Sequence, residues 1–241
     1  MEAASRRISV GGVLSEAFRI YGQHAAPLLG SAVIVFVVVG VISGLLQSGD
    51  SVVLAWLAGL VSFIGITFYT GVVVRLVEDV RDGRRDFGIG ALFRSVQGVL
   101  GSLLVNSVLR SIAIAIGFVL LIIPGLILLT VWAVTAPAIV VERRGAVEAF
   151  GRSWELVRGQ SWQVFGVLVV VFLLVIVVSA TLAAIGAAIG TAGAVIAAVV
   201  ANVLVAPAFA LASAVMFFDL GGGSVAASEP AAGPAEPSPL T

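Results

Sequence analysis

The stretch IVVERRGAVEAFGRSWELVRGQSWQVFGVLVV, residues 139–170, is apolar at both ends and densely charged in its middle. A helix through this middle would place apolar side chains on one face: Val147, Phe150, Trp154 and Val157. Its opposite face would be charged, at spacings that allow ion pairs within the helix: Arg144, Glu148, Arg152 and Glu155. We expect residues 145–158 to form an amphipathic helix on the cytoplasmic membrane face, with Trp154 inward. The alternative is a helix packed on the cytoplasmic ends of a helical bundle.

The composition around this stretch is that of a membrane protein. Of 241 residues, 60% are hydrophobic and only 11% are charged, against about 25% charged in soluble domains. A soluble chain of this length could not bury so much apolar surface. The chain is therefore predicted to be a polytopic, all-α membrane bundle, with residues 1–220 as its membrane domain.

Six apolar runs are long enough to cross a bilayer, which takes roughly 20 residues of helix. They cover residues 28–47, 52–77, 99–123, 125–141, 163–189 and 192–218. Pro124 and Gly125 are expected to form the tight turn between the third and fourth runs, because Pro lacks the donor that a continuing helix needs. The short links at 47–51, 122–126 and 186–193 divide the spans into three helical hairpins.

Arginine placement predicts the orientation of these spans. Every Arg except Arg110 lies before the first span, between the cytoplasmic end of the second span (Arg75) and the third, or between the fourth and fifth. Basic loops remain on the cytoplasmic side. We therefore expect a multi-pass protein of the cytoplasmic membrane with both termini inside.

Two further segments outside the spans carry expectations. Residues 9–22 carry an apolar stripe at helical spacing and should form an interfacial helix with Ser9 as its N-cap; the stripe is Val10, Val13, Leu14, Ala17, Phe18 and Tyr21. Residues 221–241 are rich in Gly, Pro and Ala and are predicted to be a disordered cytoplasmic tail.

Polar side chains inside the spans are the candidate functional residues, because such groups are costly in hydrocarbon. Asn106 and Arg110 lie one turn apart in the third span, and Asn202 lies in the sixth. Arg110 either binds an anion such as a lipid phosphate, or snorkels to the interface and bonds to nearby carbonyls. Asn202 either bridges two helices by a hydrogen bond or contacts a substrate.

Catalytic and cofactor-binding patterns do not emerge from the sequence. The chain has no Cys and one His, and its net charge is zero, so we expect no catalytic set, no metal site, no cofactor and no nucleic-acid partner. Glu142 and Glu148 lie among arginines, where a solvated salt network is the expected arrangement. The predicted partners are the lipid bilayer, an anionic lipid or another membrane protein.

The segments IPGLILLTVWAVTAPAIVVE (123–142) and AVEAFGRSWELVRGQSWQVFGVLVV (146–170) carry a family resemblance. They resemble the membrane domain of the glycerophosphoryl diester phosphodiesterase family and related uncharacterised six-span bacterial proteins. The resemblance implies a fold and a set of structural motif residues: Pro124, Gly125, Glu142, Glu148, Ser153 and Trp154. It does not extend to the catalytic barrel that follows the membrane domain in some relatives.

These observations predict a non-enzymatic accessory or scaffold module with a role in envelope or lipid homeostasis. The alternative is a small transporter or lipid-handling protein, with Asn106, Arg110 and Asn202 in the wall of an intramembrane cavity. A deep cavity reaching Arg110 would favour the alternative, and a closed bundle with Arg110 at its cytoplasmic surface would favour the scaffold.

Overall fold

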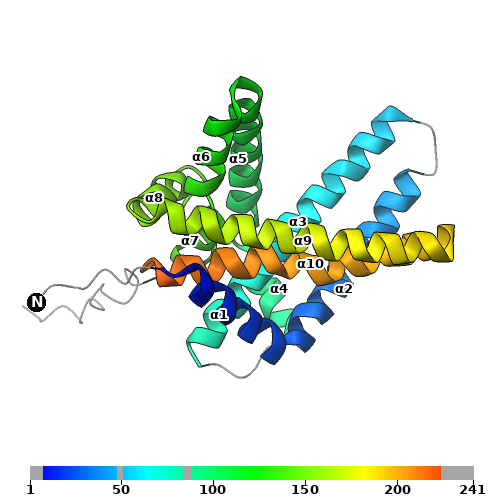
Figure 1. Cartoon of the computed structure of the whole chain (residues 1–241), viewed down its shortest axis with the longest axis horizontal. Coiled ribbons are helices and arrows are strands. Elements are labelled where there is room, and N and C mark those ends of the chain that lie inside the picture. The colour runs from blue at the N-terminus through cyan, green and yellow to red at the C-terminus, as the bar shows by residue number, and fades with distance from the viewer. Residues whose placement is uncertain (1–7, 48–50, 84–87, 224–241) are drawn as a thin grey trace, which may run out of the picture.

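The computed structural model describes residues 8–47, 51–83 and 88–223, and within these ranges the regular structure is entirely helical (Figure 1). The ten helices are α1 (Val10–Gln23), α2 (Ala25–Leu46), α3 (Val52–Arg81), α4 (Ile89–Gln97), α5 (Leu100–Leu120), α6 (Ile122–Val131), α7 (Thr135–Glu142), α8 (Glu148–Val157), α9 (Ser161–Ile189) and α10 (Thr191–Asp219). The all-α fold is confirmed.

Six segments of the described chain are long and apolar enough to span a membrane. They are α2, α3, α5, the combined segment Ile122–Glu142, α9, and Ile196–Asp219 within α10. Each overlaps one of the runs expected from the sequence. The fourth differs in kind: the expected continuous span is broken into α6 and α7 by residues 132–134.

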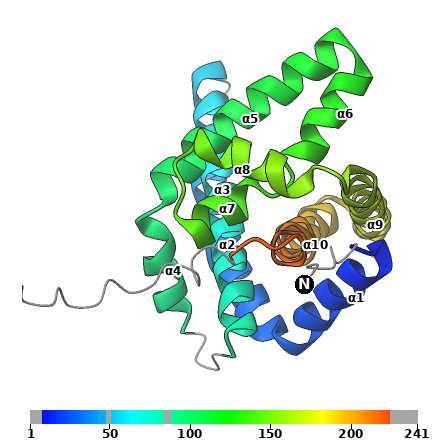
Figure 2. The same ribbon diagram turned by 90° about the vertical axis from the view of Figure 1, so that its left-hand side faces the viewer.

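Consecutive long helices pack against each other as α2 with α3, α5 with α6, and α9 with α10. The three pairs point in different directions from a common base, as Figures 1 and 2 show. The short helices α1, α4 and α8 each precede one pair in the chain. Helix α10 contacts α1, α2, α3 and α7 in addition to α9, so it forms the centre of the base.

The hydrophobic core is concentrated in this base, which we call the hub. In α3 the buried run is Val72–Val74 with Leu76 and Val77, near the C-terminal end of the helix. In α9 it is Val164, Val167 and Val171, near the N-terminal end. In α10 the residues from Ala210 to Phe217 include most of its buried side chains. The hub therefore lies at the C-terminal ends of α3 and α10 and the N-terminal end of α9, next to the segments that carry most of the Arg residues.

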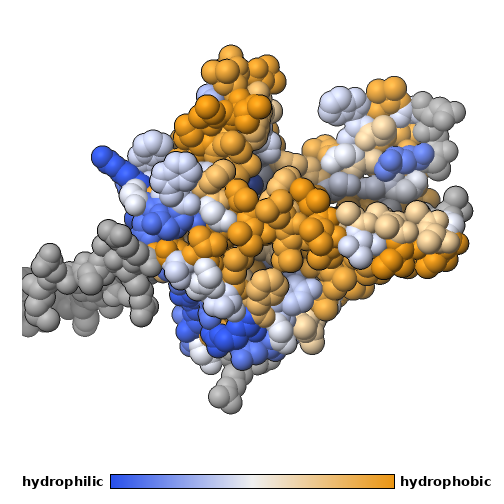
Figure 3. All heavy atoms as spheres, in the orientation of Figure 1, coloured by the Kyte–Doolittle hydropathy of each residue, from blue (hydrophilic) through white to orange (hydrophobic). Residues whose placement is uncertain are grey.

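The opposite ends of the pairs, which we call the tips, expose their apolar side chains. Leu45 is 70% exposed, Trp56 78%, Val119 85% and Ile189 73%. In water such exposure would be costly, whereas in hydrocarbon it is not. In Figure 3 the hydrophobic colour covers much of the pairs, and the hydrophilic residues gather around α8 and α1.

The link between α5 and α6 differs from the predicted turn. The turn is made by the single extended residue Leu121, and Pro124 lies in the first turn of α6, where its missing N–H would have had no partner. Gly125 is needed for close approach: a Cβ there would lie 2.6 Å from the Phe118 ring. The expectation that Pro124 and Gly125 form the turn is therefore wrong, although both residues shape the hairpin.

Helix α1 begins as expected, since the Ser9 side chain accepts a hydrogen bond from the Gly12 N–H at 3.0 Å. The buried residues of α1 are Val13 and Ile20, whereas Phe18 is 56% exposed. The predicted stripe was therefore rotated, because it omitted Ile20 and included Phe18. The Tyr21 hydroxyl donates to the Leu204 carbonyl of α10 at 3.3 Å and helps to hold α1 on the hub.

Residues 221–223 do not belong to a free tail. They form a turn after α10, in which the Gly222 N–H donates to the Phe217 carbonyl. The rest of the predicted tail, residues 224–241, lies outside the described residues.

Candidate functional site

The break between α6 and α7 follows from the position of Pro137. A proline ring clashes with the carbonyl four residues earlier, which here belongs to Ala133. Helix α6 accordingly ends at Val131, and α7 begins at Thr135, so that Pro137 lies in its first turn. The break frees backbone carbonyl groups within the fourth candidate span, where they need donors other than water.

Side chains from three other helices supply those donors. Ser153 Oγ of α8 donates to the Val131 carbonyl at 2.7 Å, and Ser213 Oγ of α10 donates to the Ala133 carbonyl at 2.6 Å. The Trp132 carbonyl accepts from Thr135 Oγ1 at 3.3 Å and from Arg110 Nη1 of α5 at 3.4 Å. We call this set of groups the break node. It ties α5, α8 and α10 to one point of the chain.

Ser153 has a second role in the break node. Its Oγ accepts a hydrogen bond from the Val134 N–H at 3.4 Å while donating to Val131. The residue is fully buried, so both backbone groups would lose their partner if the hydroxyl were removed. The family-motif position Ser153 is thus explained by the helix break.

The structure separates the three predicted intramembrane polar residues. Arg110 reaches the break node, and Asn106, one turn earlier, donates to the Ala146 carbonyl in the loop before α8 at 2.8 Å. Asn202 is exposed and donates to the Ala198 carbonyl of its own helix at 2.8 Å. The predicted helix-bridging bond of Asn202 is therefore not formed, and Asn202 does not join the other two.

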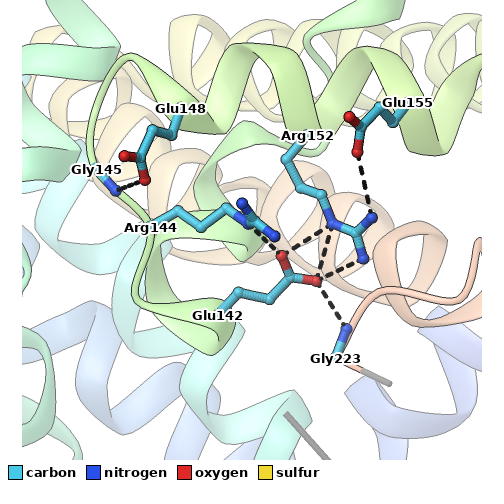
Figure 4. A network of polar contacts seen from close by, with 7 residues as sticks. All are labelled: Glu142, Arg144, Gly145, Glu148, Arg152, Glu155 and Gly223. Atoms are coloured by element: carbon cyan, nitrogen blue, oxygen red, sulfur yellow. Dashed lines mark hydrogen bonds and ion pairs between the residues drawn. The ribbon is translucent and has the colours of Figure 1, made fainter. Parts of the chain in front are cut away.

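Glu142, at the end of α7, is the centre of a second polar cluster, shown in Figure 4. Its carboxylate accepts two parallel bonds from Arg152, Nε to Oε2 and Nη2 to Oε1, each at 2.9 Å. Arg144 Nε donates to Oε2 at 2.8 Å, and the Gly223 N–H donates to Oε1 at 3.1 Å. We call this set of groups the carboxylate clasp. It joins α7, α8 and the turn after α10.

The carboxylate clasp corrects the expectation of a solvated salt network. The Glu142 side chain is only 5% exposed and that of Arg152 13%. The Glu142 hydrogen bonds raise the pKa of the Arg152 guanidinium, which therefore stays charged. Bidentate arginine–carboxylate bonds fix orientation as well as charge, so Arg152 points from α8 toward Glu142 and not outward as predicted.

Glu148 also departs from the expected pairing with Arg144 and Arg152. It is the first residue of α8, and its carboxylate accepts the Gly145 N–H at 3.2 Å. Arg144 precedes the helix and pairs with Glu142. Of the expected ion pairs within the helix, Arg152 with Glu155 at 3.5 Å is present.

The faces of α8 divide differently from the expected pattern. Its buried residues are Ala149, Ser153 and Val157, at intervals of four. Phe150 packs edge-on against Trp132 with ring centroids 4.7 Å apart. Trp154 is 52% exposed. Small residues at 149 and 153 therefore bring α8 close to the hub, while about half of Trp154 is exposed.

A polar cleft of about 780 Å³ lies at the hub, between α1, the C-terminal end of α3 and the C-terminal end of α10. Arg19 pairs with Glu16 at 2.6 Å, and Arg81 pairs with Asp219 at 2.8 Å while lying over the Phe218 ring. The Arg19 hydrogen bond holds the pKa of Glu16 below its ordinary value. The cations and anions of this cleft thus pair with each other.

Sequence reasoning missed Thr135 and Ser213 as members of the break node, and Pro137 as the cause of the break. The available signal was Pro137 within a predicted span, since a proline there releases the carbonyl four residues earlier. Ser213 carries no such signal, because its partner Ala133 lies 80 residues away.

The fold and these two polar clusters define a helical protein of multi-pass membrane type, whose hub is tied together by buried hydrogen bonds and ion pairs. The family model described as a domain of unknown function, DUF7847, matches residues 49–185. The chain therefore belongs to the DUF7847 family. No curated protein and no solved structure matches it. The resemblance to the phosphodiesterase membrane domain is not confirmed by this family match.

Proposed function

We propose that this protein is a non-enzymatic scaffold of the cytoplasmic membrane, which holds lipids or the apolar segments of a partner protein between three splayed hairpins. The observation that carries the proposal is the division between the packed hub and the exposed tips. A closed six-helix bundle would bury apolar side chains along the whole length of its helices. Here the window of α9 that could span a membrane is only 6% buried.

The orientation that we propose places the hub on the cytoplasmic side with both termini inside. The carboxylate clasp and the polar cleft bring Arg19, Arg81, Arg144 and Arg152 to the hub, and arginine is retained on the cytoplasmic side. Helices α1, α4 and α8 would then lie along that face as interfacial helices. Reporter fusions at residue 50 and at the C-terminus should report opposite sides, and an external C-terminus would refute this orientation.

The space between hairpins is suited to apolar occupants. The side chains that face outward on α2, α5 and α9 are mainly Val, Leu and Ile, and packing of apolar helix surfaces drives association in membranes. The pairs contact one another where α10 meets α2 and α3, where α3 meets α5, and where α6 meets α9, while tip residues such as Leu45, Val119 and Ile189 stay exposed. A partner helix or lipid could therefore enter between two pairs without breaking the hub.

The alternative, a small transporter, draws support from the break node, because interrupted helices line substrate sites in many transporters. The scaffold is favoured because neither the polar cleft nor the apolar groove between α2 and α3 is lined by Arg110 or Asn202. The resemblance to the phosphodiesterase membrane domain fits the same proposal, as a membrane module without hydrolytic chemistry of its own.

Photo-cross-linking in intact cells tests the scaffold. A photoreactive residue placed at Trp56 or Val119 should give discrete adducts with lipid or with one membrane protein, whereas the same residue at the buried Val73 should not. Adducts only between tips of the same chain would show that the hairpins close on each other, and would overturn the proposal that lipid or a partner segment occupies the space between them.

A further inference from the structure

Arg110 is a cation inside a candidate membrane span, and the described residues give it no carboxylate partner. The ion pairs found among the described residues are at the hub surface and the helix ends, and none includes Arg110. An uncompensated charge is expensive in a low-dielectric environment. The guanidinium therefore needs an anion, water or the headgroup layer close to it.

The hydrogen bond in the break node does not meet this need. A guanidinium has five N–H donors, and among the described residues Arg110 bonds to the Trp132 carbonyl, at a long distance of 3.4 Å. The same carbonyl already accepts from Thr135 Oγ1, and the neighbouring Val131 and Ala133 carbonyls are bonded to serines. The break node would thus remain largely satisfied without Arg110, whose other donors are available.

The surroundings of Arg110 suit an anion that arrives from the hub side. Asn106, one turn nearer the start of α5, already contacts the loop before α8. Arg110 lies about 15 Å along α5 from Leu100 at 1.5 Å per residue, and its long side chain can reach back toward the interface. Thr135, which shares the Trp132 carbonyl with it, is the first residue of α7, so the positive end of that helix faces the same region.

We propose that Arg110 binds a phosphate oxyanion at the α6–α7 break, supplied by the headgroup of an anionic phospholipid in the leaflet next to the hub. The guanidinium would present two N–H groups to two phosphate oxygens, the geometry that arginine favours. Such a lipid would supply the counter-charge that the chain lacks at this point. The inference requires α5 to lie in a membrane but does not require the scaffold role.

Native mass spectrometry of the protein in mild detergent tests this site, with titration of phosphatidylglycerol and, separately, of phosphatidylcholine. The wild-type chain should retain one phosphatidylglycerol molecule in preference to phosphatidylcholine. Arg110→Leu should weaken that retention by about tenfold or more, the size expected for loss of a charge-assisted bond pair. Arg94→Leu, which removes an exposed arginine of α4, should leave it unchanged.

Arg110→Gln guards against a folding artefact, because it keeps a polar N–H donor at this position but carries no charge. It should melt at the wild-type temperature yet lose the lipid preference. A parallel titration with inorganic phosphate identifies the source of the oxyanion: thermal protection that depends on Arg110, without lipid preference, would assign the same site to a soluble anion. Equal phosphatidylglycerol retention by folded wild-type, Arg110→Leu and Arg110→Gln chains would overturn the proposal. Photo-cross-linking at the tips does not depend on Arg110, so the lipid site and the scaffold role can each fail without the other.

Discussion

Glu142 and Arg152 face each other across the gap between α7 and α8 in a two-bond pair, with both N–O distances at 2.9 Å. The residues are ten positions apart, too far for a contact within one helix. Their pairing therefore fixes how α8 folds back on α7, and the Gly223 N–H adds the end of α10 to the same carboxylate. The carboxylate clasp is thus a tertiary lock at the hub.

The carboxylate clasp predicts unequal effects of two Glu substitutions that both affect Arg152. Glu142→Gln should lower the free energy of unfolding by about 1–3 kcal/mol, because it removes the buried charge partner of a largely buried guanidinium and leaves Arg152 only its solvated pair with Glu155. Glu155→Gln should cost about 0.5 kcal/mol or less, since Glu155 is 69% exposed and its pair with Arg152 is solvated. Denaturant titration in detergent micelles compares them, and equal losses would mean that the clasp contributes no more than a surface pair.

The break node predicts that removal of a single hydroxyl group has a large effect on stability. Ser153→Ala should destabilise the protein by about 2–4 kcal/mol, because the Val131 carbonyl and the Val134 N–H both lose their partner in a buried position. Ser161→Ala removes the same hydroxyl at the exposed start of α9 and should cost well under about 1 kcal/mol. If thermal melting of the two variants coincides, Ser153 does not stabilise the break.

The tight α5–α6 hairpin predicts opposite effects at two glycines. Gly125→Ala would place a methyl group 2.6 Å from the Phe118 ring and should cost about 1–3 kcal/mol through overpacking. Gly101→Ala meets no heavy atom within 4 Å in the same hairpin and should stabilise α5 by up to about 1 kcal/mol. Unfolding curves that rank the two variants the other way would contradict the close approach of Gly125 to Phe118.

The exposure of Trp154 predicts its contact with lipid. A spin label at position 154 should be relaxed mainly by a lipid-soluble quencher, and one at position 148 by a water-soluble quencher, because aromatic side chains settle in the headgroup layer. Equal access of the water-soluble reagent to both positions would place α8 away from the membrane surface.

The sequence was sufficient where structure depends on neighbouring residues. The apolar runs predicted the six candidate spans, and Ser9 predicted the start of α1, because hydrophobicity and capping are local properties. The positions that went wrong depend on distant partners. Ile20 is buried because α1 packs on α10, and Arg152 turns inward because Glu142 lies opposite.

The candidate site follows the same division. Arg110 was recognisable as a charge within an apolar run, and Ser153 belonged to the motif that resembles a known family. That both serve one helix break could not be seen, since the break joins α5, α8 and α10 at Trp132 and its neighbours. The carboxylate clasp was missed because a segment rich in charged residues is expected to be exposed to solvent, and the sequence alone does not show that Glu142 is buried.

Distances between hairpin tips in lipid nanodiscs test the central claim most directly. The chain has no native Cys, so spin-label pairs can be introduced at Leu45 with Trp56 within one hairpin, and at Leu45, Leu121 and Ile189 between hairpins. The Leu45–Trp56 pair should be close, because Ser43 of α2 bonds to the Ala58 carbonyl of α3 nearby. If the three pairs are splayed, electron–electron distances between them are clearly longer and more broadly distributed than this reference, and they shorten when an apolar partner binds. Inter-hairpin tip distances as short as the reference, with helices about 8–10 Å apart as in a closed bundle, would contradict this arrangement.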